Sequence, residues 1–111
     1  NDAGYILQVD TPEARWNRSD QFELLCSLAA TLAEDLFREN RLVATVINGG
    51  EKLRAQRLTD LERFIDQLAV IEPVPQMGDG FEDRSRNVIT FEPTSPHGVH
   101  ALLAGKIFAT A

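Results

Sequence analysis

The chain has little cysteine and no long hydrophobic run, and each shortage excludes a class of protein. A single cysteine, Cys26, rules out an internal disulfide, and on the apolar side of a predicted helix it is typical of a small hydrophobic residue. No apolar run approaches the roughly 18–20 residues that span a membrane, and no signal peptide is visible. The sequence therefore predicts no disulfide and no membrane-spanning segment.

Basic residues are also scarce, with 11 Lys and Arg against 17 Asp and Glu and a net charge of −6. Nucleic-acid binding rests on clustered Lys and Arg that neutralise phosphates, so we expect no nucleic-acid partner. The 111 residues allow one domain at most, residues 1–111. The chain begins at Asn1 without an initiator methionine, so we expect either a whole domain or a fragment of one.

The stretch from Ser19 to Asn48 carries the strongest structural signal. One apolar row has helical spacing (Phe22, Leu25, Ala29, Leu32 and Leu36), and a second lies beside it (Cys26, Ala30, Ala33 and Phe37). We expect a buried helix that starts at Asp20, capped by Asp20 and Glu23, and ends at Asn40 in a left-handed conformation. Leu25, Leu32 and Leu36 should be almost fully buried. The nearly all-apolar run Leu42–Ile47 predicts a strand covered on both faces.

The flanking segments extend this pattern towards an α/β fold. We predict strands at Tyr5–Val9, Asn87–Phe91 and Lys106–Thr110. Between the elements we expect a turn at Asn48-Gly49-Gly50, a polar edge strand or a loop within Glu51–Gln56, and a long loop over residues 73–86. Val99–Ala104 should form a helical turn. A second helix should start at the Thr59–Glu62 capping box and end before Pro73, with Leu61, Phe64, Ile65 and Leu68 on one apolar face. Strands that alternate with helices predict an open, mostly parallel sheet flanked by helices.

Few residues suggest a chemical site. Asp10 follows the first predicted strand, where ligand-binding groups of open α/β sheets lie, but the pattern favours a turn residue that bonds local backbone N–H groups. In a helix, His97 and His100 would share a face and could bind a metal, but glycine and proline neighbours disfavour a helix there, and a third metal ligand is missing. Asp79, Glu82 and Asp83 lack the spacing of a calcium loop. We therefore predict no catalytic residue, no bound metal and no cofactor.

The central stretch resembles a known family. Phe22–Ala33, then Arg41–Gly50, and later Leu61–Pro73 are similar to the core helix, strand, Gly turn and next helix of the bacterial domain of unknown function family fifty-eight. The resemblance covers roughly residues 5–73. It implies a von Willebrand factor A-like fold and a non-enzymatic role in protein interaction or assembly. It also implies work with a MoxR-type AAA ATPase and a cytoplasmic location, with a parent protein tethered on the cytoplasmic side of a membrane.

The resemblance also bears on metal binding. The metal-dependent adhesion site of this fold uses Asp-x-Ser-x-Ser after the first strand, and the matching residues here are Asp10-Thr11-Pro12-Glu13-Ala14. Asp10 is kept, but Pro12 and Ala14 replace both serines, so Asp10 and Thr11 mark a degenerate site. A second reading remains open, in which a small α/β enzyme or ligand-binding domain uses Asp10 with an acid from residues 79–83. If strands are missing from the sheet, its edges favour a homodimer.

Overall fold

In the computed structural model, residues 4–76 and 87–111 are described, and they form two helices and six strands. In chain order the elements are β1 (Tyr5–Val9), α1 (Ser19–Arg38), β2 (Leu42–Ile47), β3 (Leu53–Arg54), α2 (Leu58–Val70), β4 (Val88–Thr94), β5 (Gly98–Leu103) and β6 (Lys106–Thr110). The predicted α/β class is confirmed.

One sheet contains all six strands in the order β3-β2-β1-β4-β5-β6. β1 runs parallel to β2 and to β4, whereas β3, β5 and β6 each run antiparallel to the strand before them. The expectation of a mostly parallel sheet is therefore wrong, because short hairpins connect the last three strands. The β5–β6 turn shows how: Ala104 and Gly105 both have positive φ, 54° and 79°, as tight hairpin turns require.

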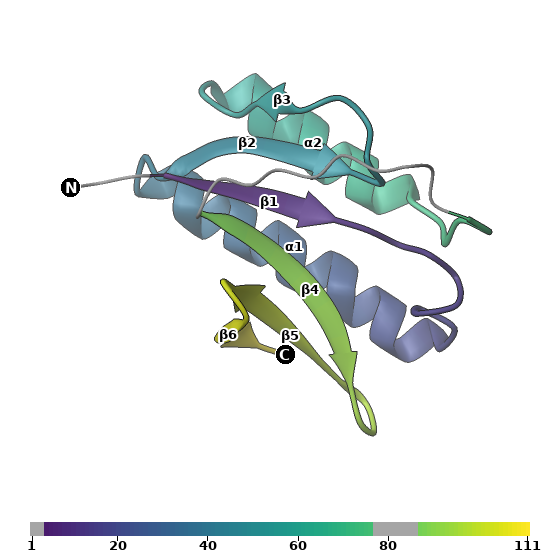
Figure 1. Cartoon of the computed structure of the whole chain (residues 1–111). Helices are drawn as coiled ribbons and strands as arrows, with labels where there is room; N and C mark the ends of the chain where they lie inside the picture. The colour runs from purple at the N-terminus through teal and green to yellow at the C-terminus, as the bar shows by residue number, and fades with distance from the viewer. Residues whose placement is uncertain (1–3, 77–86) are drawn as a thin grey trace.

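Both helices lie on the same face of the sheet (Figure 1), and α1 packs against α2 and the central strands. The main core fills this interface with Leu7 and Val9 from β1, the buried row of α1, and Leu61, Phe64 and Leu68 from α2. Leu25, Leu32 and Leu36 have exposed fractions of 0%, 9% and 5%, which confirms the buried row. α1 thus packs against the sheet through this buried row.

The opposite face of the sheet has a smaller apolar cluster. Ile6, Ala44 and Val46 are buried there, with Val88 packed against them. Leu42 belongs to the main core instead, so β2 is buried on both faces as predicted. Val43 is the exception at 48% exposed, beside the point where the β1–β2 register shifts.

Both helices begin differently from the prediction. α1 begins at Ser19 after Arg18, and the Asp20 carboxylate bonds to Arg18 and His97 rather than capping the helix. α2 begins at Leu58, and Asp60, not Thr59, supplies the capping group: its carboxylate accepts from the N–H groups of Gln56 and Arg57. The end of α1 is as predicted, with Asn40 at φ 59°.

The segments after β2 agree with the prediction in part. β3 confirms a polar edge strand, and β4 and β6 confirm the two predicted C-terminal strands. The helical turn expected at Val99–Ala104 is wrong, because this segment is β5, with Val99 and Ala101 buried at alternating positions. Most of the predicted loop 73–86 lies outside the described residues. Within the described part of the chain, no helix is both long and apolar enough to cross a membrane.

Candidate functional site

Asp10 lies directly after the last residue of β1, at the edge of the sheet where β1 and β2 end. Its Oδ2 accepts a hydrogen bond of 2.9 Å from Nε2 of Gln8. Its Oδ1 is buried and has no hydrogen-bond partner among the described residues. Among the described residues, neither Arg15, Arg18 nor a backbone N–H group bonds to this carboxylate. Asp10 therefore has one carboxylate oxygen engaged and one without a partner in the described part of the chain.

Thr11 is fully buried and ties the end of β1 to the end of β2. Its backbone N–H donates to Oδ1 of Asn48 at 2.6 Å, and Nδ2 of Asn48 donates to the Thr11 hydroxyl at 2.9 Å. The same hydroxyl donates to the carbonyl of Glu72 at 3.2 Å. These bonds occupy the Thr11 side chain, so it is not available to a ligand.

The segment that follows α2 joins the same edge. The Val74 N–H donates to the Thr11 carbonyl and the Glu13 N–H donates to the Val74 carbonyl, each at 2.8 Å. This forms a parallel bridge between Pro12 and Val74. The ends of β1 and β2 and the segment after α2 are thus fastened together. We call this region, residues 10–17, Asn48 and residues 72–75, the carboxyl edge.

A shallow groove of about 600 Å³ opens on the carboxyl edge. It is lined by Glu13, Ala14, Trp16, Asn17, Pro73 and Pro75. Trp16 is only 2% exposed, and its Nε1 donates to the Asp10 carbonyl at 2.9 Å, so the wall of the groove is fixed. Two prolines and a buried indole make the groove rigid, and among the described residues that line it Glu13 alone is charged.

The start of α1 is fastened to the β4–β5 turn close to the same side of the sheet. The buried Gln21 side chain donates to the carbonyls of Thr94 and Gly98, at 2.6 and 3.0 Å. At the surface, Nδ1 of His97 lies 2.9 Å from both the Asp20 carboxylate and the Arg18 guanidinium. The side-chain hydrogen bonds from Arg18 and His97 lower the pKa of Asp20. All three groups are exposed, so this cluster is a surface contact.

The other candidate residues are not brought together. His97 lies in a turn and His100 on β5, so the helical pairing of the two imidazoles is wrong. Asp79, Glu82 and Asp83 lie outside the described residues. Burial raises the pKa of the Cys26 thiol, which disfavours its reactive thiolate form. Among the described residues, no three His, Cys, Asp or Glu side chains are grouped as metal ligands would be.

The residues present do not fit the metal of an adhesion site. Mg²⁺ prefers six oxygen ligands in near-octahedral geometry. Pro12 and Ala14 carry no oxygen in their side chains, and the Thr11 hydroxyl is occupied by Asn48 and Glu72. Of the three motif positions 10, 12 and 14, only Asp10 keeps a side-chain oxygen.

Sequence reasoning located Asp10 and Thr11 but missed two of their neighbours. Asn48 was predicted only as a turn residue, and Glu72–Val74 only as the end of a helix. The available signal for Asn48 was a short amide side chain directly after a buried strand, next to glycine. Comparisons of the chain with family models, with curated proteins and with solved structures gave no match.

Proposed function

We propose that the chain is a bacterial, non-enzymatic protein-interaction or assembly module with a von Willebrand factor A-like fold. Its partner binds at the carboxyl edge, and a MoxR-type AAA ATPase in the cytoplasm is the partner that the family resemblance suggests. The observation that carries the proposal is the construction of this edge. Hydrogen bonds join three chain segments there, and a rigid groove lies on the surface that these segments form.

The chemistry of the edge favours binding over catalysis. The Thr11 hydroxyl and the Asn48 amide are used in structural bonds, and the described residues that line the groove include no nucleophile paired with a base. A preorganised surface loses little conformational entropy on binding, which suits a protein partner. Edge loops held on a rigid scaffold are also where binding residues of α/β folds usually lie.

Placing positive charge in the groove tests the proposal. We expect the chain to bind the MoxR-type AAA ATPase encoded in the same genome, measured by biolayer interferometry with the full-length ATPase. Glu13→Arg and Asn17→Arg, both exposed in the groove lining, should weaken binding by about tenfold or more. The matched control is Glu62→Arg on the exposed side of α2, which should leave affinity unchanged. Equal losses for all three variants, or no binding at all, would contradict the proposal.

A second function, ligand binding at Asp10, rests on one observation. The buried Oδ1 of Asp10 has no partner among the described residues, and a buried acceptor without a partner costs free energy. A small cationic or hydrogen-bond-donating ligand would satisfy it. This reading predicts that such a ligand raises thermal stability and that Asp10→Ala abolishes the rise.

Millimolar Mg²⁺ or Mn²⁺ distinguishes a metal from other ligands of Asp10. Because the adhesion-site oxygens are absent or occupied, we expect no metal-dependent change in Tm for the chain or for Asp10→Ala. A rise in the parent chain that disappears in the variant would show a working metal site.

A further inference from the structure

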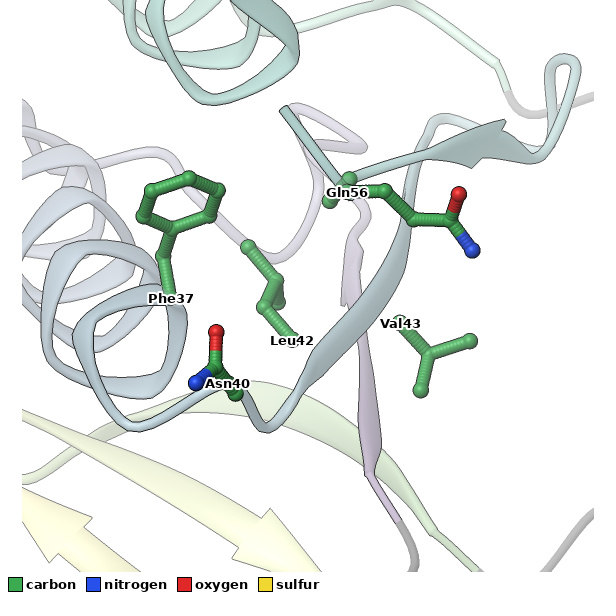
Figure 2. Close-up of a pocket in the computed structure, with 6 residues that line it drawn as sticks. Phe37, Asn40, Leu42, Val43 and Gln56 are labelled. Atoms are coloured by element: carbon green, nitrogen blue, oxygen red, sulfur yellow. The ribbon is translucent and has the colours of Figure 1, made fainter. Parts of the chain in front are cut away.

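Outside the carboxyl edge, a small pocket lies where α1 meets β2 (Figure 2). Leu42 and Ala55 form its floor and are only 6% and 3% exposed, because both belong to the main core. The Gln56 side chain points away from Phe37 and Leu42. The pocket therefore offers little apolar surface to a ligand, and the free edge of β6 is the stronger candidate for binding.

The outer side of β6 is open to another strand. β6 ends the order β3-β2-β1-β4-β5-β6, so no described strand lies beyond it. All of its residues except Ala109 are exposed, with Ile107 at 61%. Phe108, which a register shift leaves without a partner on β5, packs its ring on Tyr5 instead. Ile107 is thus the apolar side chain that this edge leaves uncovered.

The backbone of β6 also has groups directed outwards. Val99 and Ala111 exchange both of their N–H···O=C bonds, at 3.1 and 2.9 Å. Residues that exchange such bonds alternate along an antiparallel ladder with residues whose N–H and C=O point the other way. The N–H and C=O of Thr110 therefore point away from β5, towards the open side of the sheet.

An extended strand satisfies such an edge, because it supplies backbone donors and acceptors at the same spacing. β6 of a second copy is a strand of this kind, and pairing like with like makes a symmetric interface. Only two symmetric pairings exist. A two-fold axis along the strands makes them parallel, and a two-fold axis perpendicular to the sheet makes them antiparallel.

The charge on β6 distinguishes these two pairings. Lys106 is the one charged residue in the sequence of β6. In the parallel pairing it lies directly opposite Lys106 of the second copy, and like charges opposite each other are destabilising. In an antiparallel pairing centred on Phe108, it lies opposite the uncharged Thr110 of the second copy. The antiparallel pairing is therefore favoured.

We propose that two copies of the chain pair antiparallel through β6 and form one continuous sheet, with the helices of both copies on the same face. β6 runs in the direction of β1, because β4 is parallel to β1 and β5 is antiparallel to both β4 and β6. The two-fold axis thus places the two carboxyl edges at opposite ends of the strands. Resting on the proposed function, this arrangement lets one dimer join two partner molecules.

Paramagnetic broadening between the two copies tests this arrangement. A spin label is attached to Thr110→Cys in a Cys26→Ala background, and this chain is mixed at high concentration with the ¹⁵N-labelled parent chain. The label should broaden the Lys106 amide signal of the parent more than its Thr110 amide signal. The two amides lie about 13 Å apart along an extended strand, and the broadening falls steeply with distance.

Two controls identify the source of the broadening. The same label on Leu58→Cys, at a position of α2 that is 57% exposed, should leave both signals unchanged. Ile107→Lys in both chains should abolish the broadening from position 110, because a charge on an edge strand opposes pairing. Stronger broadening at Thr110 than at Lys106, or none beyond the Leu58 control, would overturn the proposal. The samples contain no ATPase, so the result is independent of binding at the carboxyl edge.

Discussion

At the scale of single residues, Thr11 holds the carboxyl edge together. Its buried hydroxyl is bonded to both Asn48 and the Glu72 carbonyl. Thr11→Val keeps the shape of the side chain but leaves the Asn48 amide and the Glu72 carbonyl without this partner. We expect the variant to lose about 1–3 kcal/mol of the free energy of unfolding, measured by urea denaturation.

The control for Thr11 is Thr31→Val on the exposed side of α1, which should change stability by less than about 0.5 kcal/mol. If both variants unfolded at the same urea concentration as the parent, the hydroxyl would contribute nothing and the edge would not depend on Thr11.

The position of Asp10 could be predicted from the sequence, but the hydrogen bonds of Thr11 could not. Asp10 could be placed at a strand end because the apolar run Tyr5–Val9 ends there. The bonds from Thr11 to Asn48 and Glu72 could not be predicted, because they join positions 37 and 61 residues apart in the sequence. Hydrophobic patterns determine which residues are buried but not which polar side chains meet at a sheet edge.

At the scale of elements, α1 carries the main core. Leu32 is 9% exposed and packs between the helix and the sheet. Leu32→Ala should therefore cost about 2–5 kcal/mol through lost burial and a residual cavity, measured by chemical denaturation. Leu58→Ala, at a position that is 57% exposed, is the comparison and should cost far less. A loss below about half a kcal/mol for Leu32→Ala would mean that α1 is peripheral.

The hydrogen bonds to Asp60 at the start of α2 should make the free energy of unfolding depend on pH. The hydrogen bond from the Arg57 N–H, together with that from Gln56, lowers the pKa of Asp60 below its ordinary value of 3.8. A carboxyl whose pKa is lower in the folded state stabilises the fold above the unfolded pKa, and this contribution is lost as the pH falls through the folded pKa. Asp60→Ala should thus lower the urea midpoint at pH 7, and the difference should shrink as the pH drops below 3.8.

Asp66→Ala, an exposed acid on the same helix, controls for the simple loss of a negative charge. A difference between Asp60→Ala and the parent that stays constant from pH 7 to well below 3.8 would show that the carboxylate is not the capping group.

Elements with a strong hydrophobic period were predictable, and those fixed by turns were not. The rows of α1 and α2 and the alternation of β1 are visible in the sequence. β5 was mistaken for a helical turn because its boundaries depend on the Ser95–His97 turn and on Ala104 at φ 54°. Alanine rarely adopts that conformation, so nothing in the residue type signals the hairpin.

At the scale of the whole molecule, the sheet ends in two unlike edges. β3 is two residues long and includes Arg54, whereas β6 is five residues long and has Ile107 61% exposed. Phe108 packs on Tyr5, with ring centroids 5.5 Å apart, which leaves Ile107 as the more exposed apolar residue. A long edge strand with apolar residues favours pairing with another chain.

We therefore expect a homodimer formed through β6, detected by sedimentation velocity at high protein concentration. Ile107→Lys should yield a monomer, because a charge on an edge strand opposes pairing. Leu58→Lys, at a similarly exposed position on α2, should remain dimeric. A monomeric parent chain at every concentration would contradict this expectation.

Site-specific photo-crosslinking would show whether a protein partner binds at the carboxyl edge. Benzoylphenylalanine would replace Asn17 in the groove in one sample and Glu62 on α2 in another, each mixed with the MoxR-type AAA ATPase. We expect a covalent adduct with the ATPase from position 17 and none from position 62. An adduct from position 62 alone, or none from either position when the two proteins bind, would contradict binding at this edge.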